Sequence, residues 1–322
     1  MFLENGSKLL EKLIVSCNDK SIPIRTFSAQ ELWLATNNYH NHQGRLWYNG
    51  SFEEQFVLIR LFPDSKSWTD FAINDLVISA QMSGHSNVLK PIGCCLETEC
   101  PILVYEFAAN GFLADRIYVS NVTQRQHQPM VWASRLKIAR QIAHATSYLH
   151  IAFSRPVIHM DIHMENILLD EHDVPKLSNF IFSISIPEGE TEVEADDSLR
   201  FSRFNIIPES EATGKVTEKS DTYKFGVFLL ELLTGDHSYT INRLTIDQDS
   251  SLVVYLHNSG QGRSINEIVD PIILAGVAGP SLDQQSQAVL QLALTCTEDD
   301  PSRRPTMVDV TKELRRIERY VS

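Results

Sequence analysis

The chain has 322 residues, 43% of them apolar and 21% charged, and its formal net charge at pH 7 is −13. This length and composition suffice to bury the core of one large or two modest domains, which excludes a wholly disordered chain. The negative charge argues against a nucleic-acid partner, because sequence-independent binding rests on Lys and Arg facing phosphates. No apolar stretch reaches the roughly 18 residues of a membrane-spanning helix, so we expect no transmembrane segment.

The first third of the chain predicts short strands and one helix. Residues 56–61 are a strand-like apolar run with a basic residue near the end, and residues 71–82 place apolar side chains at helical spacing. Residues 102–107 form a second buried run, which a turn at 109–111 closes. The pattern predicts a small, strand-rich lobe that ends near residue 110.

Beyond residue 112 the apolar residues follow a helical period. One face runs from Ile138 to Leu149, residues 225–233 are apolar on nearly every side, and a last amphipathic pattern runs from Met307 to Ile317. A helix that is apolar all round is typical of the interior of a large domain. Strands followed by helices predict an α+β fold with two lobes.

Two further features concern charge and cysteine. Residues 187–197 carry six acidic residues and no basic one, which predicts a solvated, mobile loop or, alternatively, a docking site for a basic partner. Five cysteines, an odd number, occur in a chain whose first residues do not resemble an export signal. We expect these cysteines to be buried, reduced thiols in a cytoplasmic protein, since Cys94 and Cys95 lack the spacing of a metal site.

Five motifs together resemble those of protein kinases. Residues 157–169 resemble the catalytic loop H-R-D-L-x-x-x-N, 176–180 the segment that carries D-F-G, and 208–209 the end of A-P-E. Residues 220–227 look like the start of the large buried helix, and 300–307 like the closing motif. The resemblance implies a two-lobed protein-kinase-like fold, with a small β-rich N-lobe and a large helical C-lobe.

Within that family the chain resembles plant wall-associated receptor-like kinases. The similarity lies in residues 93–99 and 103–107, and the first residues of the chain look like a juxtamembrane leader. We therefore expect a leader segment at 1–37, a kinase-like N-lobe at 38–110 and a kinase-like C-lobe at 111–322.

The nucleotide site that this resemblance implies is degenerate. Kinases cover the phosphates with a glycine-rich loop, but residues 41–50 keep at most one glycine in register, which favours a plain hairpin. Arg60 stands where the family has the strand lysine, and Asp75 takes the place of its glutamate partner. We expect these two residues to form a structural ion pair, and count Glu106 and Phe107 with them as a vestigial nucleotide site.

The catalytic loop keeps two residue types of the family and loses two. Asp161 and Asn166 match the base and the metal-binding Asn, whereas Met160 and His163 replace an Arg and the Lys that contacts the γ-phosphate. A zinc site built from His159, Asp161 and His163 is an unfavoured alternative, because no further ligand is suggested. We expect no metal site.

The D-F-G position reads Asn179-Phe180-Ile181, so a neutral amide replaces the carboxylate that Mg²⁺ prefers. The structural motifs are intact. Glu209 and Arg304 match the family's buried ion pair, and Asp221 matches the residue that anchors the catalytic loop. The chain therefore keeps the residues that fold the domain and lacks those that handle ATP.

Small cytoplasmic chains with these losses resemble the resistance-related pseudokinases of plants, of the ZED/ZRK type. The resemblance implies an adaptor or decoy in innate immunity that binds a coiled-coil NLR receptor and receptor-like cytoplasmic kinases modified by pathogen effectors. It implies no required cofactor, weak or absent ATP binding, and recruitment to the plasma membrane only through partners. Two alternatives stay open, a weak serine/threonine kinase that uses Asp161 as base and a non-catalytic nucleotide sensor.

Overall fold

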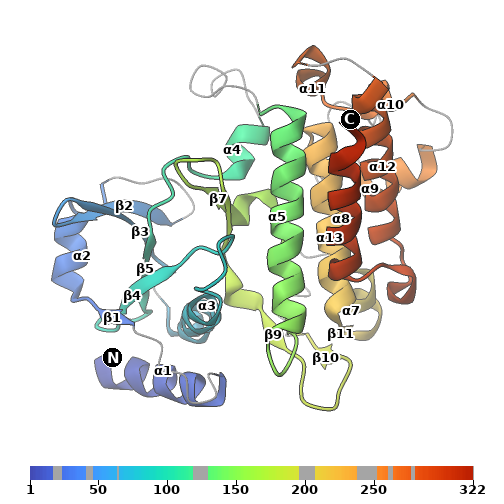
Figure 1. Ribbon diagram of the computed structural model, residues 1–322. Helices are drawn as coiled ribbons and strands as arrows, with labels where there is room; N and C mark the ends of the chain where they lie inside the picture. The colour runs from blue at the N-terminus through green and yellow to red at the C-terminus, as the bar shows by residue number, and fades with distance from the viewer. Residues whose placement is uncertain are drawn as a thin grey trace. The chain divides into compact units, whose positions relative to one another are not determined.

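A computed structural model describes residues 1–16, 24–40, 46–63, 65–118, 130–195, 207–237, 252–259, 264–276 and 280–321. The chain divides into two compact units. The smaller unit comprises Met1–Gly111 and Leu168–Ser183, and the larger unit comprises Phe112–Ile167 and Ile184–Ser322. The smaller unit carries the main sheet and the larger unit is helical, which confirms the predicted α+β fold (Figure 1).

The smaller unit is built on a five-stranded sheet of order β1-β4-β5-β3-β2. Its elements are α1 (Phe2–Ser16), β1 (Arg25–Thr26), α2 (Ala29–Ala35), β2 (Trp47–Phe52), β3 (Gln55–Arg60), η1 (Lys66–Trp68), α3 (Thr69–Gln81), β4 (Pro91–Cys95), β5 (Ile102–Glu106), β8 (Pro175–Leu177) and η4 (Phe180–Phe182), and β7 (Ile167–Leu169) pairs with β8. The predicted strands at 56–61 and 102–107 and the predicted helix at 71–82 are thus confirmed within two residues.

Strands β2 and β3 form a hairpin, whose register decides which residue of β2 lies opposite Arg60. Glu53 and Glu54 form its turn, and both have positive φ values, of 47° and 69°. This pairing places Trp47 directly opposite Arg60. Of residues 41–50, for which a plain hairpin was expected, 47–50 form the start of β2 and 41–45 lie outside the described residues.

Helix α1 belongs to the smaller unit. The side-chain amide of Asn5 is buried and donates hydrogen bonds to the carbonyl oxygens of Leu96 (3.1 Å) and Thr98 (3.0 Å), in the turn between β4 and β5. Lys8 forms an ion pair of 2.8 Å with Asp70 at the start of α3. The expected leader is therefore partly an ordered helix that packs on the unit's own surface.

The opposite face of α1 is apolar and exposed. Leu3, Leu10 and Ile14 are 84%, 59% and 70% exposed. Their spacing of seven and four residues places them along one side of the helix, away from the Asn5 face. We call these three residues the α1 stripe.

The larger unit is helical. Its elements are α4 (Leu113–Ile117), α5 (Trp132–Ile151), β6 (Val157–Ile158), η3 (Met164–Asn166), β9 (Ile184–Ser185), β10 (Val193–Glu194), α7 (Pro208–Thr213), β11 (Lys215–Val216), α8 (Glu218–Thr234), α9 (Leu252–Ser259), α10 (Ile265–Ile268), α11 (Pro271–Gly276), α12 (Pro280–Cys296), η5 (Pro301–Arg303), α13 (Met307–Glu318) and η6 (Arg319–Val321). Helix α13 packs on α5, and α12 packs on α8 (Figure 1).

Helix α8 runs through the interior of this unit. Thr217 caps its N-terminus by accepting a hydrogen bond from the backbone N–H of Lys219, and Gly235 ends the helix with φ 70°. The helix approaches α12 closely at Gly226, where an added Cβ would lie 2.7 Å from the Cβ of Cys296. The prediction that residues 225–233 form a buried helix is confirmed, although Val227 is only half-buried.

The acidic segment 187–197 differs in part from the expected loop. Val193–Glu194 form strand β10, which pairs antiparallel with β11, and Glu192 forms an ion pair with Lys215. Asp196 and Asp197 lie outside the described residues. Residues 187–192 are exposed, as a solvated loop would be, whereas Val193 and Glu194 are held by backbone pairing with β11.

Two other predictions concern cysteine and the membrane. Cys94, Cys95, Cys100 and Cys296 are buried, free thiols, as expected, whereas Cys17 lies outside the described residues. Across the described ranges, none of the helices combines the length and the apolar character needed to span a bilayer.

Candidate functional site

In the smaller unit, Arg60 joins the strand and helix positions of the expected nucleotide site. Its Nη1 lies 2.7 Å from Oδ2 of Asp75, which is the predicted ion pair. Its Nη2 donates a hydrogen bond of 2.5 Å to Oδ1 of Asn179. Because both terminal nitrogens bind protein oxygens, the planar fork of Arg60 is directed at the chain itself.

The Arg60 guanidinium also lies over two aromatic rings. The central carbon Cζ lies 5.2 Å from the ring centroid of Trp47 and 4.8 Å from that of Phe62. These distances are typical of cation–π contacts, which are stronger for desolvated groups. The Arg60 side chain is only 11% exposed, so its charge is stabilised by Asp75 and by two rings rather than by water.

Asp75 is the buried centre of this cluster. Besides the bond from Arg60, its Oδ2 accepts a hydrogen bond of 2.9 Å from the Tyr105 hydroxyl, and its Oδ1 accepts one of 2.7 Å from the backbone N–H of Phe180. Burial, together with the nearby Asp75 charge, raises the pKa of Tyr105 well above its ordinary value. A buried carboxylate with several donors tethers helix α3 to the residues around Asn179.

A second bond network holds the residues that follow Asn179. The side-chain amide of Asn74 donates hydrogen bonds of 2.9 Å to the carbonyl oxygens of Phe180 and Ser183. Asn179 itself has a left-handed backbone with φ 69°, which Asn tolerates better than most residues. Two neighbouring residues of α3, Asn74 and Asp75, thus hold the backbone of the segment that resembles D-F-G.

Glu106 and Phe107 do not join this cluster. In the pairing of β3 with β5, Leu103 lies opposite Arg60 and Glu106 lies opposite Val57, at the other end. Three residues along a strand correspond to about 10 Å. Glu106 accepts a hydrogen bond from the Lys90 backbone N–H instead. Of the four predicted vestigial nucleotide residues, the structure brings together Arg60 and Asp75.

In the larger unit, Asp221 anchors the loop at residues 157–166, which we call the Asp161 loop. Its Oδ2 accepts a hydrogen bond of 2.8 Å from the backbone N–H of His159, and its Oδ1 one of 2.9 Å from that of Met160. His150 Nε2 lies 2.8 Å from Oδ2. Met160 has a left-handed backbone with φ 72°, a conformation that these bonds hold in place.

Asp161 is almost fully buried and contacts two side chains of its own loop. Asn166 Nδ2 donates a hydrogen bond of 2.8 Å to Oδ2, and His163 Nε2 lies 3.3 Å from Oδ1. Burial alone would raise the pKa of Asp161, but the charge and hydrogen bond of His163 and the charge of Lys224 outweigh it and lower this pKa. Burial likewise opposes protonation of His163, but Asp161 raises the pKa of that imidazole. These contacts favour the ionised carboxylate, whereas an effective general base has a pKa near the working pH.

Lys224 is a buried lysine on α8, one turn after Asp221. It is 4% exposed, which is rare for lysine. Burial lowers the pKa of its ammonium to about 8, although the charges of Asp161, Glu231 and Asp221 raise it. Lys224 thus lies on the same helix as Asp221, the residue that anchors the Asp161 loop, and its charge helps to lower the pKa of Asp161.

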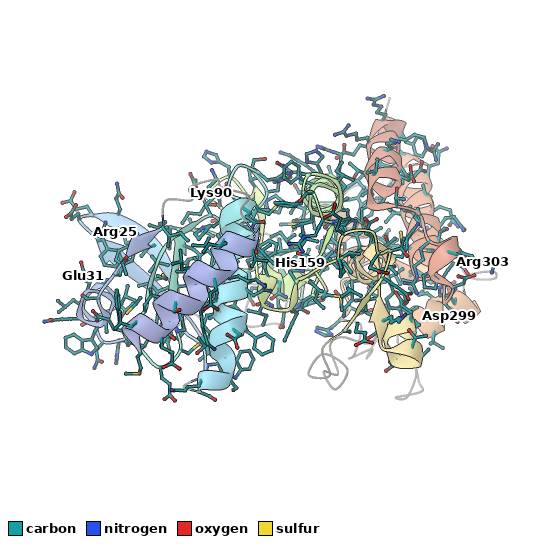
Figure 2. All side chains as sticks on the ribbon, turned by 90° about the horizontal axis from the view of Figure 1, so that it is seen from below. Arg25, Glu31, Lys90, His159, Asp299 and Arg303 are labelled. Carbon is teal, nitrogen blue, oxygen red and sulfur yellow. The ribbon has the colours of Figure 1, made fainter. Side chains whose placement is uncertain are left out.

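The predicted ion pair of Glu209 and Arg304 lies elsewhere in the larger unit. The pair is bidentate, with Nη1 2.9 Å from Oε1 and Nη2 2.8 Å from Oε2. Ser220 donates a further hydrogen bond of 2.7 Å to Glu209, and the guanidinium lies over the ring of Tyr223. Asp299 and Arg303, which are close to Arg304 in the sequence, lie at the periphery of the larger unit (Figure 2). His159, of the Asp161 loop, is buried in the same unit.

The magnesium–nucleotide complex that the kinase resemblance implies does not fit these residues. The amide of Asn179 has one oxygen, and that oxygen already accepts a bond from the Arg60 cation. In the other unit, Asn166 directs its donor nitrogen to Asp161, whose carboxylate faces His163. Mg²⁺ prefers anionic oxygens, but the Asn179 oxygen is neutral and bound to a cation, and the Asp161 carboxylate is engaged by Asn166 and His163.

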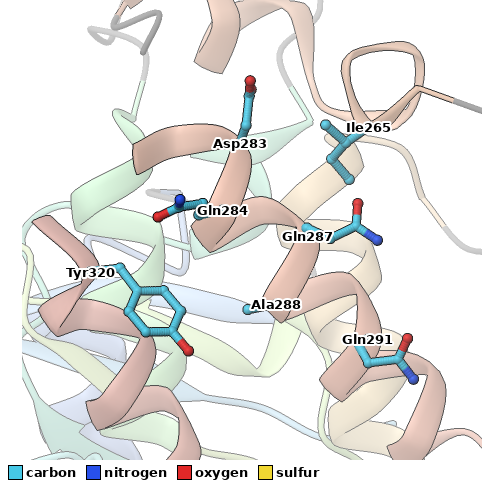
Figure 3. Close-up of a pocket in the computed structure, with 7 residues that line it drawn as sticks. All are labelled: Ile265, Asp283, Gln284, Gln287, Ala288, Gln291 and Tyr320. Carbon is cyan, nitrogen blue, oxygen red and sulfur yellow. The ribbon is translucent and has the colours of Figure 1, made fainter. Parts of the chain in front are cut away.

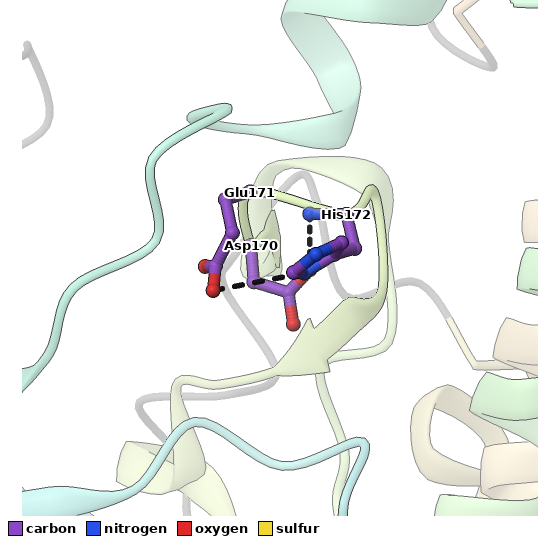
Figure 4. Close-up of side chains that lie close together, drawn as sticks. All are labelled: Asp170, Glu171 and His172. Carbon is purple, nitrogen blue, oxygen red and sulfur yellow. Dashed lines mark hydrogen bonds and ion pairs between the residues drawn. The ribbon is translucent and has the colours of Figure 1, made fainter.

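Two other features of the described residues, a pocket and a group of polar side chains, lie apart from these clusters. A shallow pocket of about 670 Å³ lies along α12 and includes none of the predicted site residues (Figure 3). Asp170, Glu171 and His172 offer carboxylate and imidazole atoms within 4.8 Å of one another (Figure 4). Asp170 accepts hydrogen bonds from the backbone N–H groups of His172 and Val174, so its position is explained by the turn it caps.

Sequence reasoning missed three residues of these clusters. Tyr105 was recognised only as part of a buried strand, Trp47 only as a bulky residue in place of glycine, and Lys224 only as part of the motif at 220–227. A usable signal existed for Lys224, because it lies between the anchor residue Asp221 and an apolar run at 225–233, within a helix expected to be buried. The contact of Trp47 with Arg60 depends on the register of the hairpin, which no motif specifies.

Comparison with known proteins agrees with the motifs. Residues 42–314 match the family described as protein tyrosine and serine/threonine kinase. Among curated relatives from Arabidopsis thaliana, the serine/threonine-protein kinase ZRK1 is 38% identical over 98% of this chain and 92% of its own length. The non-functional pseudokinases ZRK2 and ZED1 are 37% and 38% identical over 98% of this chain, covering 89% and 96% of their own lengths. The chain therefore belongs to the protein kinase family and, within it, to the ZED/ZRK type, whose members include both named kinases and named pseudokinases.

Proposed function

We propose that the chain is a non-catalytic, kinase-like adaptor of plant innate immunity. The observation that carries the proposal is the engagement of Arg60, whose two terminal nitrogens bind Asp75 and Asn179 and whose guanidinium lies over the rings of Trp47 and Phe62. A group with this many protein contacts is poorly placed to bind phosphates. The names of the relatives ZRK2 and ZED1, both non-functional pseudokinases, support the same proposal.

Radiolabelled phosphate transfer, measured beside nucleotide thermal shift on one preparation, tests the loss of catalysis. We expect no transfer from Mg-ATP or Mn-ATP to the chain itself or to a general protein substrate. Transfer that disappears in Asp161→Ala would overturn the proposal and favour a serine/threonine kinase with Asp161 as base. A rise in melting temperature with ATP that survives chelation of metal would instead favour the nucleotide sensor.

In this proposal one partner is a coiled-coil NLR immune receptor, which binds the α1 stripe. Three exposed apolar side chains on a helix that is tethered to the unit offer a preformed contact surface. Leu10→Glu with Ile14→Glu should abolish co-purification of the receptor from plant extract. Ile151→Glu is the matched control, because Ile151 is also exposed, at 67%, but lies on α5 of the larger unit. Equal binding by both variants would remove the α1 stripe from the proposal.

The second proposed partner is a receptor-like cytoplasmic kinase that a pathogen effector has modified, and it binds the acidic segment. Glu188 and Glu190 are exposed and precede strand β10, so they present negative charge to a basic surface. Glu188→Gln with Glu190→Gln should weaken capture of the modified kinase and reduce the salt dependence of binding. Unchanged capture would contradict this placement. In the proposal the chain acts in the cytoplasm, and its partners recruit it to the plasma membrane.

A further inference from the structure

Helix α1 packs on α3, the helix that carries Asp75, and contacts it near both ends (Figure 1). Lys8 forms its ion pair of 2.8 Å with Asp70, in the first turn of α3. The backbone carbonyl of Ser16, the last residue of α1, accepts a hydrogen bond of 3.0 Å from the side-chain amide of Gln81, the last residue of α3. Asp70 and Gln81 are about three helical turns apart, so they lie on the same side of α3. Helix α1 therefore spans one side of α3.

The middle of α3 holds part of the segment that resembles D-F-G, residues 180–183, which we call the Phe180 segment. Asn74 donates hydrogen bonds of 2.9 Å to the carbonyl oxygens of its first and last residues. Asp75 accepts a hydrogen bond of 2.7 Å from its first backbone N–H and pairs with Arg60. One helix thus connects α1 with the Phe180 segment and with Arg60, all within the smaller unit.

The docking of α1 rests on few buried side chains. Asn5 and Leu9 are the buried residues of this helix, Leu13 is half-buried, and the ion pair of Lys8 is exposed. A segment with few buried contacts opens locally at a lower free energy than the core does. A helix of 15 residues is also marginal in water without such contacts. We therefore expect a docked state of α1, which dominates, and a released state in which the helix is lost.

We propose that α1 is a clamp. When docked, it holds α3 in place and thereby fixes Arg60 and the Phe180 segment, and when released, it allows both to loosen. The α1 stripe lies on the other side of the helix, so a protein that binds there finds its surface assembled only while α1 is docked. Such a partner favours the docked state and tightens the clamp. This last step rests on the proposed receptor surface, whereas the clamp itself does not.

Two double variants of the full chain test the clamp. Asn5→Ala with Leu9→Ala, the docking variant, removes the buried side chains of α1. Leu10→Ala with Ile14→Ala, the stripe variant, removes exposed side chains of the same helix. Alanine is the best helix former, so neither variant loses α1 through helix propensity. We expect the docking variant to release α1 and the stripe variant to leave it docked. If the docking variant does not fold, Leu9→Ala alone replaces it.

Hydrogen exchange, followed peptide by peptide, reports the release of α1 and its consequence. In the docking variant, exchange of residues 2–16 should rise roughly tenfold, and exchange of the Phe180 segment should rise roughly fivefold. The backbone N–H of Phe180 is the most direct reporter, because Asp75 of α3 holds it. Exchange in α5, which belongs to the other unit, should stay unchanged and so exclude general destabilisation. The stripe variant should match the unchanged chain in all three places.

Coupling between two sites is reciprocal, so loosening of the Phe180 segment should in turn release α1. Asn74→Ala removes the side-chain hydrogen bonds to that segment and should raise exchange of residues 2–16 roughly threefold. Three results would each overturn the clamp: unchanged exchange of α1 in the docking variant or in Asn74→Ala, a released α1 with unchanged exchange in the Phe180 segment, or an equal rise in α5. A receptor that fails to co-purify overturns the proposed partner alone, because the exchange measurements need no partner.

Discussion

Oδ1 of Asn179 accepts a hydrogen bond of 2.5 Å from Nη2 of Arg60, the residue whose Nη1 pairs with the buried Asp75. The arginine therefore links strand β3, helix α3 and the residues before η4 within the smaller unit. An amide oxygen bound in this way stabilises the arginine, while in a kinase the same position serves the metal. The stability of the smaller unit should depend strongly on this one side chain.

Replacing Arg60 tests that dependence. Arg60→Met should lower the free energy of unfolding by about 3–5 kcal/mol, because it leaves the Asp75 carboxylate buried without its cation. Arg60→Lys should cost less, since it keeps the charge but loses the fork that reaches both partners. Urea unfolding followed by tryptophan fluorescence measures both values. A loss below about 1 kcal/mol for Arg60→Met would show that the ion pair is not structural.

The pair of Glu209 and Arg304 should behave as a second structural unit. Arg304→Met leaves a carboxylate that is 11% exposed without its bidentate partner, and we expect a loss of about 3 kcal/mol or more. Ser220→Ala removes one hydrogen bond to the same carboxylate and should cost about 1 kcal/mol. Chemical unfolding measures both. Equal losses for the two variants would contradict the dominant role of the arginine.

The pair of His163 and Asp161 should give stability a pH dependence of known sign. The pKa of His163 is raised above 6.5, so its contribution is complete below pH 6.5 and is lost as the pH rises through the folded value. The pKa of Asp161 is lowered from 3.8, so its contribution is lost only in strong acid. Between pH 6.5 and 7.5 the unchanged chain should lose stability relative to His163→Gln, with a slope of at most about 1.4 kcal/mol per pH unit. The control is His172→Gln, at an exposed position, whose free energy of unfolding should change with pH as that of the unchanged chain does. If the difference in free energy of unfolding between His163→Gln and the unchanged chain did not vary with pH, the coupling would be disproved.

Gly226 should be essential for the packing of α8 against α12. An added Cβ would lie 2.7 Å from both Cβ of Cys296 and Cγ2 of Thr297, closer than packed side chains allow. Gly226→Ala should therefore cost about 1–3 kcal/mol through displacement of one helix. Gly84→Ala is the control, because no atom lies within 4 Å of its added Cβ. Similar melting temperatures for the two variants would contradict the close approach.

The sequence allowed much of this architecture to be predicted, for identifiable reasons. Periodicity revealed α3, α5, α8 and α13 because each has a regular apolar pattern, and the motifs revealed Glu209, Arg304 and Asp221 because these residues keep their spacing. The Arg60–Asp75 pair followed from the same motifs. These features depend on local pattern or on order along the chain.

The contacts that could not be predicted depend on register and on three-dimensional neighbours. Trp47 lies opposite Arg60 because the hairpin turns at Glu53 and Glu54, and two glutamates with positive φ are not a recognisable turn signal. Lys224 is buried because of how α8 packs within the larger unit, and the apolar run at 225–233, which begins after it, does not reveal this.

The bond between Asn5 and the turn after β4 has a practical consequence for anyone who labels this protein. Because the helix is fixed from its first turn, a tag fused before Met1 would stand beside Leu3 and shield the receptor-binding residues that the immune proposal requires. A failed capture with such a reagent would reflect the tag rather than the protein. Epitopes and fluorescent reporters therefore belong at a position away from α1.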